Sequence, residues 1–163
     1  MSMVLREELS EGIVAITLNR PESLNALSPA LFSELNQIVT ELSKQTDSVG
    51  CVILRGAGRC FSAGNDLKAV QSGVKAKEKF FQAKTLDLLE KLPQPTIASV
   101  HGHCLTGALE LAIACDLMIT SESANLADTH GKWGMVPGWG MSVRLPRRVG
   151  LLKAKEMMFT GMS

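Results

Sequence analysis

A short apolar run passes through a glycine turn into an apolar helix near the middle of the chain. Residues 96–100 form the run, Gly102 and Gly107 lie in the turn, and residues 108–115 have helical character. A strand followed closely by a helix leaves free N–H groups at the helix start, where the helix dipole adds positive charge. Such a place can stabilise an oxygen that becomes negative during a reaction. Glu110 lies in the first helical turn, where burial of a carboxylate is costly, so it is a candidate functional residue.

Hydrophobic periodicity predicts alternating strands and helices along the rest of the chain. Residues 4–9 and 13–18 flank Gly12 as an expected hairpin, and Ser28 followed by Pro29 is a favourable helix start. This alternation favours an α/β fold with a largely parallel sheet. Further strands are expected at residues 51–54, 96–100 and 117–120, and helices at 29–44, 67–70 (capped by Asp66), 75–92, 108–115, 140–149 and 151–159, with loop over most of 125–139.

Two glycines after the strand at residues 51–54 invite comparison with a dinucleotide-binding turn. Gly56 and Gly58 match the first two glycines of that fingerprint, but the third would fall on Phe61. No favourable helix begins there either. The sequence therefore argues against a Rossmann-type nucleotide site.

Composition limits the number of domains and the classes of partner. The chain has 163 residues, 45% of them hydrophobic, and a formal net charge of +1, which favours one domain over residues 1–163. The charge balance and the lack of a long apolar run give no indication of a nucleic-acid or membrane partner. Four cysteines without Cys-x-x-Cys spacing indicate reduced thiols, and no metal site is expected. The first residues resemble no signal or transit peptide, which favours a cytoplasmic location, although a mitochondrial matrix protein that had lost its transit segment would look the same.

Four ordered motifs connect the chain with a known family. They are Asn19-Arg20-Pro21 with residues 24–27, residues 60–67 with the pattern F-x-A-G-x-D-[LI], residues 102–110 close to G-x-x-x-G-G-x-x-E, and Pro137-Gly138 with residues 144–150. In order and spacing these motifs resemble the crotonase superfamily, the enoyl-CoA hydratases and isomerases, over nearly the whole chain. Thr106 departs from the third motif, where a glycine is more usual.

The resemblance implies a spiral of ββα turns and an acyl-CoA thioester as substrate. It also implies an oxyanion hole formed by the backbone N–H groups of Asn65 and Gly107, which would stabilise a thioester enolate. No cofactor is expected beyond the CoA of the substrate, and the chain is expected to assemble with its own copies into a trimer or hexamer. The residues expected to contact the substrate or its CoA are Ser23, Leu24, Asn25, Ala26, Ala63, Asp66 and Leu67.

The same resemblance implies two acid–base residues beside the substrate double bond. Glu110 falls on the first position, and His130 falls on the second, where the family commonly has a glutamate. Histidine exchanges protons near neutral pH, so a Glu110/His130 pair can supply acid–base chemistry. Asp128 lies two residues before His130 and can influence it if the loop brings them together. The leading prediction is hydration of a 2-enoyl-CoA, with Glu110 and His130 as catalytic residues.

Several alternatives stay open from sequence alone. Glu110 also fits a helix-dipole role, and His130 fits an ordinary loop histidine. The same fold can support double-bond isomerisation, thioester hydrolysis or decarboxylation, and a non-catalytic CoA-binding scaffold is the rival from another class. The sequence ends at residue 163, before the C-terminal helical region of family members, so we expect the family's N-terminal core without that region.

Overall fold

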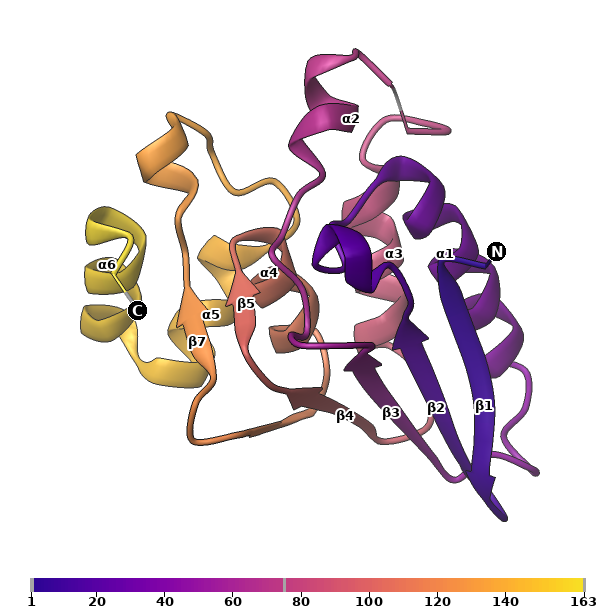
Figure 1. Cartoon of the computed structure of the whole chain (residues 1–163). Helices are drawn as coiled ribbons and strands as arrows, with labels where there is room; N and C mark the ends of the chain where they lie inside the picture. Colours follow the sequence, from indigo (N-terminus) through magenta and orange to yellow (C-terminus); the bar gives the residue numbers. More distant parts are fainter. Residues whose placement is uncertain (1, 75, 163) are drawn as a thin grey trace.

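The computed structural model describes residues 2–74 and 76–162, and its main element is a five-stranded sheet (Figure 1). The sheet order is β1-β2-β3-β4-β6, with β1 antiparallel to β2 and all later neighbours parallel. In one row across the parallel strands, Ala15, Ile53, Ile97 and Leu117 lie side by side. The predicted hairpin and the largely parallel sheet are confirmed. The strand bounds are β1 Val4–Ser10, β2 Ile13–Leu18, β3 Cys51–Gly56, β4 Thr96–Val100 and β6 Leu117–Thr120.

A second, smaller layer of strand pairing lies beside the main sheet. β5 (His103–Leu105) pairs in parallel with β7 (Asn125–Ala127), and single bridges join Ser62 to Cys104 and Leu27 to Asn65. Successive turns of the chain therefore add one strand to the main sheet, one extended segment to this layer, and then a helix. This is the expected spiral of ββα turns. The sequence analysis missed β5 and β7, because a strand of three residues is too short to show an alternating pattern.

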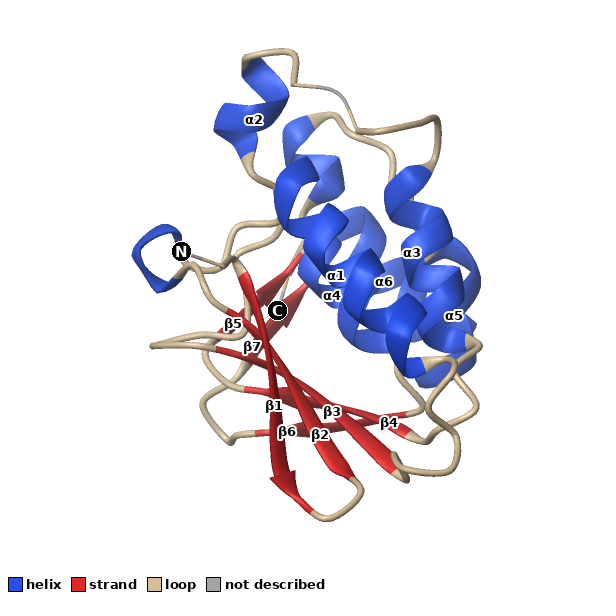
Figure 2. Cartoon of the chain, turned by 90° about the vertical axis from the view of Figure 1, so that its right-hand side faces the viewer, coloured by secondary structure: helices blue, strands red, loops and turns tan. Residues whose placement is uncertain are grey.

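The helices gather on one side of the main sheet (Figure 2). α1 begins at the predicted position, where the Ser28 hydroxyl accepts a hydrogen bond from the Leu31 N–H at 3.2 Å. All seven residues of α4 are buried, including Glu110. No helix in the described residues is long and apolar enough to cross a membrane. The helix bounds are α1 Pro29–Leu42, α2 Leu67–Gln71, α3 Phe81–Glu90, α4 Gly107–Ile113, α5 Met141–Val149 and α6 Leu151–Thr160, with short 3-10 turns at Pro21–Ser23 (η1) and His130–Trp133 (η2).

The helix expected at residues 75–92 is wrong at its beginning. α3 starts only at Phe81, after Phe80 takes a left-handed conformation with a φ of 62°. The preceding side chains from Lys77 to Phe80 are exposed, so additional helical turns there would bury no apolar face. Short helical extensions are marginal in water without such packing. Residue 75 lies outside the described residues.

Candidate active site

The turn between β5 and α4 brings two distant parts of the chain together. The Thr106 N–H donates to the carbonyl of Ala127, the last residue of β7, at 2.8 Å. The end of β7 therefore lies against the start of α4. Because residues 128–130 follow directly, this contact places them beside the first turn of the buried helix that carries Glu110.

Thr106 adopts a backbone conformation that glycine tolerates better. Its φ is 56° and its ψ is −115°, a region that costs a residue with a side chain about 1–3 kcal/mol. The Thr106 hydroxyl shares a short hydrogen bond with the Thr129 hydroxyl, which compensates part of this cost. The departure from the family motif at this position is thus accommodated by a second hydroxyl from the loop after β7.

The backbone N–H groups of Asn65 and Gly107 are among those at this place without an acceptor in the described part of the chain. Asn65 also lines a pocket of about 140 Å³, together with Thr106 and Thr129. Gly107 packs tightly: a Cβ there would lie 2.2 Å from Asn65 Oδ1 and 2.4 Å from the Trp139 ring. The two residues predicted to supply the N–H donors, Asn65 and Gly107, are therefore neighbours, and Asn65 lines the pocket.

Glu110 has one oxygen that is held and one that is free. Oε1 accepts hydrogen bonds from the backbone N–H groups of Trp139 at 2.8 Å and Met141 at 3.0 Å. Oε2 is buried without a hydrogen bond in the described residues and lies 3.7 Å from His130 Nε2. Burial raises the pKa of the Glu110 carboxyl, and the two backbone hydrogen bonds oppose this effect. A carboxyl with a raised pKa and a free oxygen is suited to exchange a proton.

The ring of His130 lies between two carboxylates. Asp128 Oδ1 is 2.6 Å from Nδ1, and the same oxygen accepts the His130 backbone N–H at 3.1 Å. The exposed fractions of Asp128, His130 and Glu110 are 1%, 3% and 1%, so the cluster is almost dry. Glu110 and His130, predicted as a pair from distant segments, thus face each other. Neither lines the 140 Å³ pocket; their neighbours Thr106 and Thr129 do.

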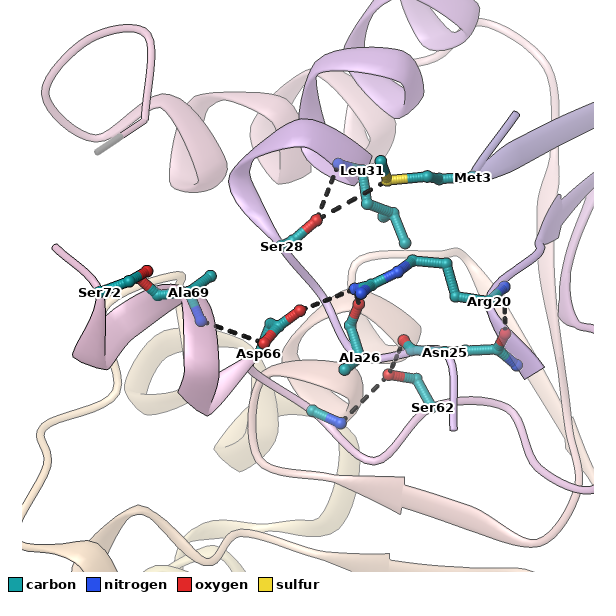
Figure 3. A network of polar contacts seen from close by, with 11 residues as sticks. Met3, Arg20, Asn25, Ala26, Ser28, Leu31, Ser62, Asp66, Ala69 and Ser72 are labelled. Carbon is teal, nitrogen blue, oxygen red and sulfur yellow. Dashed lines mark hydrogen bonds and ion pairs between the residues drawn. The ribbon is translucent and has the colours of Figure 1, made fainter. Parts of the chain in front are cut away.

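Four of the seven residues expected to contact the substrate or its CoA line a second pocket, close to the polar network drawn in Figure 3. Ser23, Ala26, Asp66 and Leu67 line a pocket of about 270 Å³ whose other lining residues include Arg20 and Lys68. Ala63 instead lines the 140 Å³ pocket together with Asn65. Leu24 lies between Ser23 and Ala26 and adopts a left-handed backbone conformation.

Asn25 is the predicted contact residue that faces inward (Figure 3). Its Oδ1 accepts the Arg20 N–H, and its Nδ2 donates to the carbonyls of Ala57 and Cys60. The residue is fully buried. Its side chain therefore holds this loop together and is not available to a ligand.

Acid should weaken the contact between the two loops that form the second pocket. Asp66 caps α2 through the Ala69 N–H and pairs with Arg20 at 2.8 Å, and this Arg20 contact lowers the Asp66 pKa below its usual 3.8. The stabilisation is complete above that value and is lost as the pH falls through the lowered pKa. We expect Asp66→Asn to reduce the free energy of unfolding by up to about 1 kcal/mol at pH 7 and by less in acid. Urea unfolding against pH measures this difference, with the exposed Asp47→Asn as control; a pH-independent difference would contradict it.

Arg144 is a site residue that the sequence analysis did not single out. It is 6% exposed, donates to the Trp139 carbonyl at 2.7 Å and pairs with Asp87 and Glu90 on α3. Arg144 thereby fixes the loop whose N–H groups hold Glu110. The sequence places Arg144 in the fourth motif, but only the structure shows that its guanidinium donates to the Trp139 carbonyl.

The ββα spiral, the N–H groups without an acceptor in the described residues at a buried helix start, and Glu110 facing His130 beside them are the features of the crotonase class. Comparison with known proteins agrees. The sequence model described as enoyl-CoA hydratase/isomerase matches residues 8–163. The chain belongs to the enoyl-CoA hydratase/isomerase family.

Relatives with sequence and structural likeness carry names of this family. The chain is 39% identical to a probable peroxisomal enoyl-CoA hydratase of Arabidopsis thaliana, over 94% of this chain and 57% of that protein. It is 42% identical to a putative enoyl-CoA hydratase/isomerase of Bacillus subtilis, over 93% and 60%. The crystal structure of an enoyl-CoA hydratase from Bacillus anthracis matches with a TM-score of 0.89 and 38% identity, over 98% of this chain and 63% of that chain. The chain thus spans about three fifths of the length of these relatives.

Proposed function

We propose that this chain carries the reaction centre of an enoyl-CoA hydratase, which adds water to the double bond of a 2-enoyl-CoA. The observation that carries the proposal is the buried Glu110 Oε2, which accepts no hydrogen bond from the described residues and faces His130 Nε2 at 3.7 Å. Hydration needs one group that takes a proton from water and another that gives a proton to carbon. A carboxylate and an imidazole that hold one proton between them supply both.

In the proposed reaction the thioester oxygen accepts hydrogen bonds from the N–H groups of Asn65 and Gly107. These donors stabilise the negative charge that develops as water attacks. Glu110 takes a proton from water while the water oxygen bonds to the β carbon and the π bond breaks. His130 then gives a proton to the α carbon. Glu110 now holds a proton and His130 lacks one, so transfer from Oε2 to Nε2 restores the starting state.

The 270 Å³ pocket is the proposed place of the CoA moiety. Lys68 is the proposed partner of the CoA phosphates there, since Arg20 on the same wall is paired with Asp66 and Glu22 adds a second carboxylate. Ser23 and Ala26 contribute a hydroxyl and a small apolar surface there. No other cofactor enters the proposed chemistry, because acid–base groups and N–H donors suffice for it.

Two further expectations stay predictions. Assembly into trimers or hexamers would cover apolar side chains that are exposed on β6 and α6, namely Leu117, Met118, Ile119, Leu151, Leu152 and Phe159. A cytoplasmic location, with the mitochondrial matrix as alternative, is likewise a prediction; the names of relatives include peroxisomal and mitochondrial forms.

A panel of CoA thioesters tests the function. We expect the purified chain to remove the ultraviolet absorbance of 2-enoyl-CoA substrates and to form 3-hydroxyacyl-CoA, because the site holds both proton-transfer groups. Calorimetry on the same thioesters measures binding separately. Formation of 2-enoyl-CoA from 3-enoyl-CoA without hydration would identify an isomerase. Binding of every thioester without turnover of any would establish the scaffold alternative.

A further inference from the structure

The carboxylate of Asp128 makes two contacts with one residue. Its Oδ1 accepts both the backbone N–H of His130 at 3.1 Å and the ring Nδ1 at 2.6 Å. The backbone contact closes a tight turn directly after β7, and the ring contact points the imidazole toward α4. Because Asp128 is 1% exposed, water does not compete for these hydrogen bonds.

The contact also determines which ring nitrogen is available for chemistry. An ionised carboxylate only accepts hydrogen bonds, so Nδ1 must carry a hydrogen and donate it. Nε2 is then the nitrogen that gains and loses a proton, and it is the atom that lies 3.7 Å from Glu110 Oε2. Without the Asp128 carboxylate, no hydrogen bond at Nδ1 would favour the tautomer of the neutral ring that carries its hydrogen on Nδ1.

We propose that Asp128 is a positioning residue that holds His130 with Nε2 toward Glu110 and balances the charge of the ring when Nε2 is protonated. The inference rests on the proposed function, and it gives the site an Asp128–His130–Glu110 chain in place of an isolated pair. The carboxylate acts through His130 and exchanges no proton with substrate. A turn-closing role alone would require only an acceptor for the His130 backbone N–H.

Asp128→Asn separates the two roles. Both contacts use Oδ1, so an amide oxygen in that place still accepts from the backbone N–H and from Nδ1, and the substitution removes the negative charge that balances a protonated ring. We expect kcat for hydration of 2-enoyl-CoA to fall about 10- to 100-fold with little change in KM, the range typical of carboxylates that orient a metal-bound histidine. Asp47→Asn, on an exposed loop, is the matched control and should leave kcat unchanged.

Nitrogen NMR of the imidazole gives a second, activity-independent result. The chain has three histidines, and the signal lost in His130→Gln identifies the ring concerned. In the wild-type chain at a pH where this ring is neutral we expect hydrogen on Nδ1, and in Asp128→Ala, which removes the acceptor, a mixture of tautomers. A wild-type ring with its hydrogen on Nε2, or an unaltered kcat in Asp128→Asn, would overturn the inference. Absence of turnover in the folded wild-type chain would count against the proposed function alone, since the tautomer measurement would still decide the role of Asp128.

Discussion

Glu110→Gln should lower the turnover of a 2-enoyl-CoA by about 10²- to 10⁴-fold, the usual contribution of an acid–base group. The amide oxygen can keep both hydrogen bonds from the Trp139 and Met141 N–H groups, so the loop stays in place. The amide nitrogen then lies where Oε2 faces His130, and it cannot take a proton from water. Loss of enoyl-thioester absorbance measures turnover, and calorimetry should show nearly unchanged affinity.

The same substitution should leave the fold at least as stable as the wild type. Burial raises the pKa of Glu110, which means that the folded state disfavours its charged form. A carboxyl of this kind destabilises the native state at neutral pH, and a neutral amide removes that penalty. We therefore expect an equal or higher Tm together with the loss of turnover. Glu122→Gln, on an exposed loop, is the matched control; full turnover in a folded Glu110→Gln chain would remove Glu110 from the mechanism.

The sequence predicted those parts of the fold that depend on local patterns. The helix start at Ser28, the cap at Asp66 and the strand at residues 96–100 follow from capping chemistry and hydrophobic runs, and each lies where it was expected. The failures have local causes too. The helix predicted at residues 75–92 is too long, because residues 77–80 are exposed and helix propensity alone does not hold them in a helix.

The candidate site was predictable as a set of residues but not as a geometry. The motifs placed Glu110 and His130 in one site, yet nothing in their spacing shows that Oε1 is held by loop amides and Oε2 is free. Asn25 was expected to face a ligand, whereas its amide lies inside the loop, which is a matter of side-chain direction. Arg144 donates a hydrogen bond to the carbonyl of Trp139, five residues earlier in the chain. Whether such a hydrogen bond forms depends on the path of the intervening loop, which the sequence pattern does not show.

Gly107→Ala should lower turnover by about 10²- to 10³-fold, the effect of losing one oxyanion donor. The new methyl group would lie 2.2 Å from Asn65 Oδ1 and 2.4 Å from the Trp139 ring, so the start of α4 must move away from one or both. Such a displacement separates the two N–H groups that would bind the same oxygen. Because this site is rigidly packed, a small shift is sufficient.

The clash itself provides the control for this prediction. Asn65→Ala removes Oδ1, an atom without a hydrogen bond in the described residues, and keeps the backbone N–H. In the double variant Asn65→Ala/Gly107→Ala the contact with Oδ1 is removed, while the contact with the Trp139 ring stays. We therefore expect the double variant to turn over faster than Gly107→Ala alone. Such a non-additive result is expected when two substitutions interact sterically. Gly50→Ala, where a Cβ meets nothing closer than 3.7 Å, should behave as wild type. Circular dichroism must show that each variant is folded. Wild-type turnover in a folded Gly107→Ala chain would mean that the carbonyl oxygen is not bound between Asn65 and Gly107. Strictly additive losses in the double variant would mean that the contact with Asn65 Oδ1 does not cause the loss.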